Sequence, residues 1–504
     1  MSVPDEPPPL SGQLQLAVRD TVNPSIESVD GDISEINLRN NNNFNSSLTL
    51  VNVNENQFKK PKIDFNEKLK YKDVWAIILF VCTIIITIVI ACISLPHINL
   101  GKVVNYNSKY HDDYKECIMF IIVSGIISII GSAILTLIYM LLVKYCGEKM
   151  IKGTLFFSLI FYLIHISWCI IIPYIYIYPF KLFYVIIFSV LIISSYFIWK
   201  SKIPLAKDIL KTVNSVIRRN PDIFKIGFIG CAIACIWYIF LSFAMFATIS
   251  YSNEKGKGVI YLCIIYIFFL FSFYYSSQVI KNIVHVTTAG IFATYYLHGV
   301  IDPISNKVEV DNRSITLKSL KRAITTSFGP ICYGSLTIPI IKIFEWIVQN
   351  SCCCFKCIHP CIYHLKKYFN EYAFTNVFIY GESYREAAKN TWTVFKEHGF
   401  EKLIKDNIID KVLNLGAVTV VFSFMETNLF LGLFLINNKW YSFLAVYLIA
   451  SALISVMVFS IFAEIIKSGV ATTIVCLCED SETMHQNQLE FWEKIKDSYP
   501  TLTI

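Results

Sequence analysis

Residues 277–298 read SQVIKNIVHVTTAGIFATYYLH, a mostly apolar stretch in which Gln278, Lys281, Asn282 and His285 lie close together. A membrane helix needs about 20 apolar residues to cross the hydrocarbon layer, and a charge near its centre costs at least about 2.5–3.5 kcal/mol. We therefore expect these polar residues to lie at a turn between two spans, where Lys281 can reach the interface. The other three either line a polar route or cap that turn.

The composition of the whole chain favours lipid as its solvent. Its 504 residues are 55% hydrophobic and only 16% charged, whereas soluble domains contain roughly 25% charged residues. Long apolar segments must be helical in lipid, because a helix satisfies its own backbone hydrogen bonds. We predict an all-α, polytopic membrane helix bundle of about ten transmembrane helices. The predicted spans are 74–95, 117–143, 155–178, 182–199, 226–250, 259–280, 283–300, 324–348, 412–436 and 441–466.

The chain has a formal net charge of +7, and the positions of its lysines and arginines predict its orientation in the membrane. Its cations lie between the apolar runs and do not form the single basic face that nucleic-acid binding requires. Lysines cluster at 59–72, before the first span, which places the N-terminus in the cytosol, and ten spans return the C-terminus to that side. The loop 301–323 should then lie outside, although it is basic. A glycosylation sequon at Asn312 agrees with an outside position.

The chain divides into three predicted regions. Residues 1–65 are polar and poor in aromatic side chains, so we expect a disordered cytosolic tail. Residues 66–480 form the membrane domain, and residues 481–504 form a cytosolic C-terminal tail. Within the membrane domain, the basic linker 200–222 predicts an amphipathic helix that lies either on an anionic membrane surface or against the bundle. The Cys-rich and helical segment 350–410 is expected to be cytosolic, and its charged and aromatic part 361–410 predicts a helical hairpin.

A cysteine cluster, SCCCFKCIHPC at residues 351–361, directly follows the span 324–348. Its place on the predicted cytosolic side fits reversible S-palmitoylation. Zinc binding has less support because no second cysteine pair lies at finger spacing, and a run without any role is the third alternative. The candidate acylation sites are Cys352, Cys353, Cys354 and Cys357.

Sequence motifs for catalysis are missing. The sequence has no G-x-S-x-G, P-loop or H-E-x-x-H motif, so we predict neither an enzyme nor a bound metal or cofactor. Polar residues within spans carry more information. Glu426 lies in the middle of one, and it either lines a polar pathway or forms a structural hydrogen bond. The glycines and prolines of the span 324–348 indicate either a broken helix at a transport site or close helix packing.

Four blocks occur in the order SSQVIKNIVHVTTAGIFATYYL (276–297), SFGPICYGSLTIPIIKIFEW (327–346), FTNVFIYGESYREAAKNTW (374–392) and IKSGVATTIVCLCEDSE (466–482). Together they resemble the choline transporter-like family, solute carrier family 44. The resemblance implies a bundle of about ten helices with both termini cytosolic. It also implies alternating-access transport of choline or a related cation such as ethanolamine. The short loop 96–116 is similar to the fungal and protist branch, whereas animal members have a long extracellular domain there.

From this resemblance we expect a facilitative transporter, in the plasma membrane or, as the alternative, in an internal membrane. A membrane potential alone can drive a cation inward, at about 2.3 kcal/mol per 100 mV. We expect the pathway between the spans 226–250, 259–300 and 324–348, with aromatic faces, hydroxyl-orienting groups and a carboxylate. The candidate pathway residues are Trp237, Tyr274, Tyr333, Gln278, Asn282, His285, Ser327, Glu345 and Glu426.

Two other classes of protein stay open. A channel or a lipid scramblase could use the same polar groove, and would show flux that does not saturate or lipid movement between leaflets. A membrane scaffold or enzyme that acts through the cysteine cluster has less support, since catalytic motifs are missing. The expected partners are a small organic cation and the lipid bilayer. The sequence leaves ion coupling and oligomeric state open.

Overall fold

The computed structural model describes residues 70–97, 125–143, 197–256, 258–302, 307–309, 315–350, 369–435 and 441–500, with isolated positions at 145–194, 362–366 and 502. All of these residues belong to one compact unit, residues 61–504. Several sequence-based expectations fall outside the described residues: the tail 1–65, the sequon at Asn312, the cysteine cluster 351–361, and most of the spans 155–178 and 182–199.

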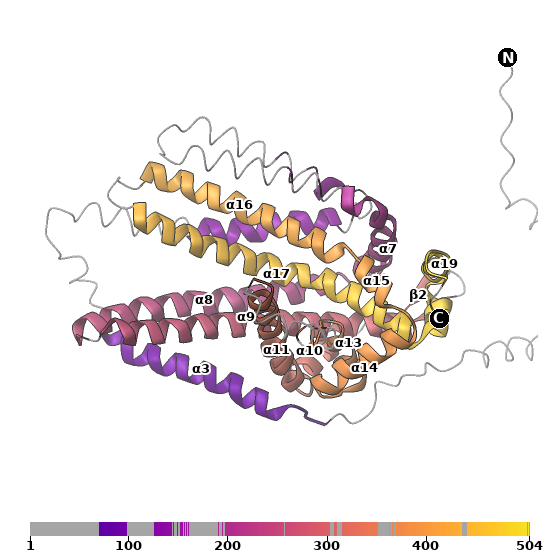
Figure 1. Ribbon diagram of the computed structural model, residues 1–504, viewed down its shortest axis with the longest axis horizontal. Coiled ribbons are helices and arrows are strands. Elements are labelled where there is room, and N and C mark those ends of the chain that lie inside the picture. The colour runs from indigo at the N-terminus through magenta and orange to yellow at the C-terminus, as the bar shows by residue number, and fades with distance from the viewer. Residues whose placement is uncertain are drawn as a thin grey trace, which may run out of the picture. The chain divides into compact units, whose positions relative to one another are not determined.

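The described residues are predominantly helical (Figure 1). The long helices are α3 (Val74–Ser94), α8 (Asp222–Glu254), α9 (Val259–His298), α11 (Phe328–Asn350), α16 (Ile409–Leu435) and α17 (Tyr441–Glu479). The shorter ones are η1 (Leu95–His97), η3 (Lys200–Lys202), α7 (Ile203–Arg219), α10 (Ile315–Ile324), α13 (Ala373–Tyr380), α14 (Tyr384–Glu397), α15 (Glu401–Asp406), α18 (Ser481–Asn487) and α19 (Leu489–Ser498). The strands β1 (Val300–Asp302) and β2 (Lys307–Glu309) form a small antiparallel hairpin.

Seven helices among the described residues are long and apolar enough to cross a membrane. These are Val74–His97, Gly125–Val143, Asp222–Ser252, Val259–Leu297, Phe328–Asn350, Glu401–Leu429 and Ser451–Glu479. The predicted all-α, polytopic membrane bundle is therefore confirmed. In Figure 1, α8, α9 and α17 are neighbouring long helices, and α9 packs against both of the others.

The turn that we expected between the spans 259–280 and 283–300 is wrong, because α9 runs through both as one helix. Between Val259 and His298 the sequence has no proline, and its one glycine is Gly290, so neither of the two strongest helix breakers occurs near Lys281. The 40 residues of α9 make a rod of about 60 Å, roughly twice the thickness of the hydrocarbon layer.

The surroundings of α9 change along its length. In its N-terminal half, apolar side chains point outward, and Val259, Ile264 and Ile267 are 75%, 63% and 68% exposed. From Asn282 to Leu297 most side chains are buried, because α10, α11, α13 and α17 pack around this half. An outward apolar surface is what lipid covers. The polar residues at 278–285 therefore lie where α9 passes from a lipid-facing to an enclosed environment.

The amphipathic helix predicted in the basic linker is α7, and its apolar stripe is packed on the bundle. Ile209, Val213 and Val216 are fully buried in the main hydrophobic core. This core also contains residues of α17 and α19, and both helices contact α7. Lys211 and Arg218 point outward. Of the two alternatives for this linker, packing against the bundle is the one observed.

Gly329→Ala is expected to destabilise the fold, because the start of α3 lies directly against this glycine. A methyl group at this position would overlap the backbone oxygen of Lys72 and lie 3.0 Å from that of Asp73. Backbone atoms cannot swing aside as the tip of a side chain can, and overpacking costs about 1–3 kcal/mol. We expect a lower melting temperature for the purified protein in detergent.

Gly153→Ala is the matched control, since no atom lies within 4 Å of the methyl group that it would add. Equal melting temperatures for these two variants would contradict the close contact at Gly329.

Candidate functional site

A buried carboxylate on α17 binds two side chains of α9. Oε1 of Glu464 lies 2.6 Å from Nδ1 of His285, and its Oε2 lies 3.1 Å from Nζ of Lys281. Lys281 and His285 are four residues apart and so lie on one face of the helix. The side chains of Glu464 and His285 are fully buried. An ionised carboxylate that is buried without a partner costs several kcal/mol, so these contacts are what make Glu464 tolerable here.

Hydrogen bonds hold the backbone and neighbours of this cluster in place. The hydroxyl of Ser468, one turn after Glu464, donates to the backbone oxygen of His285 at 2.7 Å. The side-chain amide of Asn282 donates to the hydroxyl of Ser335 on α11 at 2.8 Å. Nε2 of His285 has no hydrogen-bond partner among the described residues. The cluster therefore joins α9, α11 and α17 and leaves one buried polar atom available to another group.

A second ion pair extends this charged region toward the end of α11. Nζ of Lys342 lies 3.2 Å from Oε1 of Glu371, which precedes α13. The positive charge of Lys342 holds the pKa of Glu371 well below its usual range, and Lys281 and Lys467 add to this effect. Glu371 is therefore electrostatically coupled to the same lysine that binds Glu464.

A chain of aromatic rings leads from α3 to the buried cluster. Trp75, which is half exposed, lies 5.0 Å from Tyr333, and Tyr333 lies 5.7 Å from Tyr384, measured between ring centroids. Tyr384 lies 5.1 Å from Phe374, whose ring is 5.6 Å from that of His285. Ring faces carry the negative part of the aromatic quadrupole and attract organic cations. The chain thus connects an exposed edge of the bundle with its most buried charges.

The structure brings only some of the predicted pathway residues together. Asn282 and His285 belong to the cluster, and Tyr333 belongs to the aromatic chain. Ser327 is buried beside α11, and its hydroxyl has no hydrogen-bond partner among the described residues. Gln278 is half-buried, one turn before Lys281 on α9.

Other predicted pathway residues make separate contacts. The indole N–H of Trp237 donates to the hydroxyl of Ser276 at 2.8 Å, and Tyr274 is partly exposed on the lipid-facing part of α9. Glu345 is paired with Lys366 at 2.8 Å. Glu426 lies on α16, but its side chain is outside the described set.

Glu464 is the main residue that the sequence reading missed. It lies within the predicted span 441–466, in the stretch FSIFAEIIKSG. A carboxylate within an apolar span is a functional candidate by default, so the signal was present. Tyr384 and Glu371 had no comparable signal, because they lie outside any predicted span and join the region through tertiary packing.

Long apolar helices packed around enclosed ion pairs define a polytopic α-helical membrane protein. Residues 183–482 match the family model described as plasma-membrane choline transporter. The chain belongs to this family, the choline transporter-like family, as its four sequence blocks predicted. The matched region contains the buried cluster and the aromatic chain apart from Trp75.

The similar curated proteins come from fungi and from a protist, as the short first loop predicted. Protein PNS1 of Mycosarcoma maydis is 30% identical over 340 residues, which cover 62% of this chain and 62% of that protein. Protein PNS1 of Gibberella zeae is 25% identical over 86% of this chain and 83% of that protein. A CTL-like protein of Dictyostelium discoideum is 28% identical over 75% of this chain and 66% of that protein. For the Mycosarcoma and Eremothecium gossypii proteins, the match spans about three-fifths of the relative.

Proposed function

We propose that this protein is a membrane transporter for a small organic cation of the choline type, with ethanolamine as the second candidate substrate. Membership of the plasma-membrane choline transporter family supports this class of substrate. The observation that carries the proposal is Glu464, a fully buried carboxylate held among packed membrane helices by Lys281 and His285. Buried ionisable groups in membrane helices are costly and usually serve a transport pathway.

The cluster suggests how a cation could be handled. The ammonium group of Lys281 is paired with the carboxylate of Glu464 in this structure. In our proposal a substrate cation competes with Lys281 for this carboxylate. Tyr333, Tyr384 and Phe374 would offer ring faces to a quaternary ammonium group. The amide of Asn282 would bind the substrate hydroxyl.

The remaining pathway candidates stay in the proposal with the roles that the sequence suggested. Trp237 and Tyr274 would supply further ring faces, and Gln278, His285 and Ser327 would supply polar contacts. Glu345 and Glu426 would offset charge elsewhere along the route. Transport would be facilitative and driven by the membrane potential, at about 2.3 kcal/mol per 100 mV for one charge.

Uptake into proteoliposomes tests the substrate class. We expect saturable, protein-dependent uptake of labelled choline or ethanolamine, and faster uptake when the inside is made negative. Absence of uptake for both compounds would overturn the proposed substrate. Flux that does not saturate would indicate a channel, and movement of fluorescent lipid between leaflets would indicate a scramblase.

Glu464→Gln is expected to reduce this uptake at least about tenfold, because it removes the negative charge that the substrate cation is proposed to bind, and a contact with a charged group contributes about 1.5–3 kcal/mol. Glu493→Gln is the matched control, since Glu493 is an exposed glutamate on α19 and belongs to no part of the cluster. Equal uptake by the two variants would show that the carboxylate of Glu464 takes no part in transport.

A further inference from the structure

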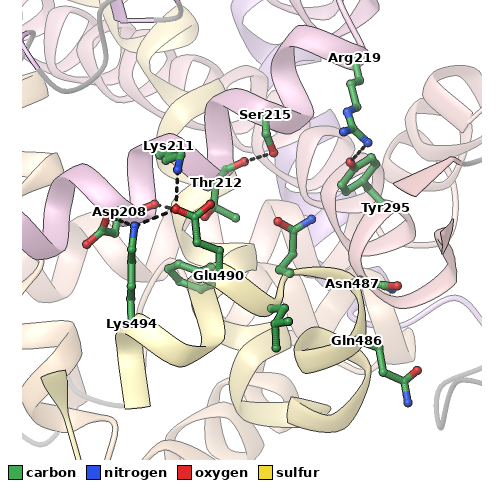
Figure 2. A pocket seen from close by; sticks show the side chains of 13 residues that line it. Asp208, Lys211, Thr212, Ser215, Arg219, Tyr295, Gln486, Asn487, Glu490 and Lys494 are labelled. Atoms are coloured by element: carbon green, nitrogen blue, oxygen red, sulfur yellow. Dashed lines mark hydrogen bonds and ion pairs between the residues drawn. The ribbon is translucent and has the colours of Figure 1, made fainter. Parts of the chain in front are cut away.

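A cavity of about 460 Å³ lies between α7 and the C-terminal helices α18 and α19, with Tyr295 of α9 at one end (Figure 2). Its lining shares no residue with the buried cluster around Glu464. Serine, threonine and amide side chains form part of its walls. Five charged side chains also line it: Asp208, Lys211, Arg219, Glu490 and Lys494.

The carboxylate of Glu490 lies between two lysine ammonium groups in this cavity. Oε1 of Glu490 accepts hydrogen bonds from Nζ of Lys211 at 2.6 Å and from Nζ of Lys494 at 2.9 Å, as Figure 2 shows. The side chain of Glu490 is 66% exposed, so these two lysines hold it and packing does not. Their hydrogen bonds, that from Lys211 first, lower the pKa of Glu490 to about 2. Two ammonium groups that converge on one oxygen form a site for negative charge.

The charges that line the cavity fit a doubly charged anion once Glu490 leaves. With Glu490 in place, three cations face two carboxylates and leave a net charge of +1. Without it, Asp208 is the one carboxylate among the described residues that line the cavity. Asp208 pairs with Lys494 at 3.3 Å, and the net charge of these lining residues becomes +2. A phosphate monoester carries about −1.5 to −2 charges at pH 7. Phosphate therefore matches the site more closely than a second carboxylate does.

The third cation lies at the far end of the cavity, where it is held in position. A guanidinium N–H of Arg219 donates to the hydroxyl of Tyr295 at 2.5 Å, and the guanidinium carbon lies 5.6 Å from the centroid of that ring. A planar guanidinium offers several donors in a fixed fork that suits phosphate oxygens. Ser215 lies on α7 between Lys211 and Arg219 (Figure 2), and Asn487 also lines the cavity.

We propose that this cavity binds a phosphate group, carried either by a lipid head group or by a free phosphate compound, at Lys211, Arg219 and Lys494. When no ligand is bound, the carboxylate of Glu490 accepts the hydrogen bonds of Lys211 and Lys494 in place of the phosphate. Because Glu490 belongs to α19 and Lys211 to α7, phosphate binding replaces one of the contacts between these helices. This assignment stands independently of what the protein transports.

Binding to the full-length protein in nanodiscs tests the assignment with two probes. The first is inorganic phosphate, and the second is phosphatidylcholine vesicles that contain phosphatidylinositol bisphosphate, compared with vesicles of phosphatidylcholine alone. Saturable binding of both supports a site for any accessible phosphate, and binding of the vesicles alone identifies a lipid head group. Binding of neither probe overturns the proposal, as does an equal signal from sodium chloride at matched ionic strength.

Two substitutions separate a ligand site from a structural ion-pair contact. Lys211→Gln combined with Lys494→Gln should weaken phosphate binding about tenfold, because charge-assisted hydrogen bonds are lost. Lys496→Gln is the matched control, since Lys496 lies on the same helix against the ring of Trp492 and does not line the cavity. It should bind phosphate as the unmodified protein does, and equal weakening in the control would overturn the site.

Glu490→Gln gives the most diagnostic result. It removes the internal competitor and should tighten phosphate binding about threefold, in keeping with the modest strength of an exposed ion pair. A contact that only holds α19 against α7 predicts no gain in affinity. Unchanged or weaker phosphate binding in Glu490→Gln would therefore contradict the proposal.

Discussion

Glu464→Ala is expected to lower the free energy of unfolding by about 3–5 kcal/mol, because it leaves the ammonium group of Lys281 largely buried and without its carboxylate. His285 loses the partner of its Nδ1 atom in the same variant. Thermal unfolding of the purified protein in detergent measures this effect. A melting temperature equal to that of the unmodified protein would show that the ion pair contributes nothing to folding.

The double variant Glu464→Met with Lys281→Met distinguishes a structural charge pair from a functional one. Removing both charges also removes their desolvation cost, and apolar replacements of buried pairs are often neutral or stabilising. We therefore expect most of the lost free energy of unfolding to return. The part contributed by the hydrogen bond between His285 and Glu464 should not return. Uptake of substrate should stay low, because the carboxylate is absent. A double variant that is as unstable as Glu464→Ala would contradict this account.

Ile283→Pro is expected to cost about 3 kcal/mol or more, because it places a proline inside α9. Residue 283 lies near the middle of the helix, where its backbone N–H belongs to the hydrogen-bond ladder. If the chain turned between two spans here, as the apolar run lengths suggested, the same substitution would be tolerated. Melting temperature and yield of folded protein in detergent report the difference.

Val259→Pro is the matched control for this prediction. Val259 is the first residue of α9 and follows Gly258, whose backbone is extended. Proline is well accommodated at the first position of a helix after an extended residue. Equal loss of stability in the two proline variants would contradict the continuous helix.

The fold class followed from the sequence because lipid leaves few choices. Apolar runs of 20 or more residues must be helices in a bilayer, and α3, α8, α11, α16 and α17 all lie where such runs predict them. The reading of α9 failed because it divided a long apolar stretch into lengths that match the bilayer. Residues 282–297 are mostly apolar because other helices of the protein surround them, whereas the sequence pattern was interpreted as a second segment surrounded by lipid.

The candidate site was only half visible in the sequence. Asn282 and His285 stood out as polar residues in an apolar stretch. Their partners Ser335 and Glu464 lie 53 and 179 residues further along the chain, and one sequence gives no measure of such distant pairing. The contribution of Phe374 and Tyr384 depends on how α13 and α14 fold back onto α9 and α11, which is a matter of tertiary packing.

The unbroken length of α9 has a thermodynamic consequence. Lys281 and Tyr295 are fourteen residues apart on this helix, or about 21 Å, so one rigid element joins the buried carboxylate to the cavity beside α7. At its far end, the backbone oxygen of Tyr296 accepts a hydrogen bond from Asn487 at 2.8 Å, which ties α9 to α18. In the proposed function a substrate cation replaces Lys281 at Glu464, and a displacement of α9 during that exchange would change both sets of contacts. By linkage, any factor by which phosphate alters the affinity for the cation is the factor by which the cation alters the affinity for phosphate.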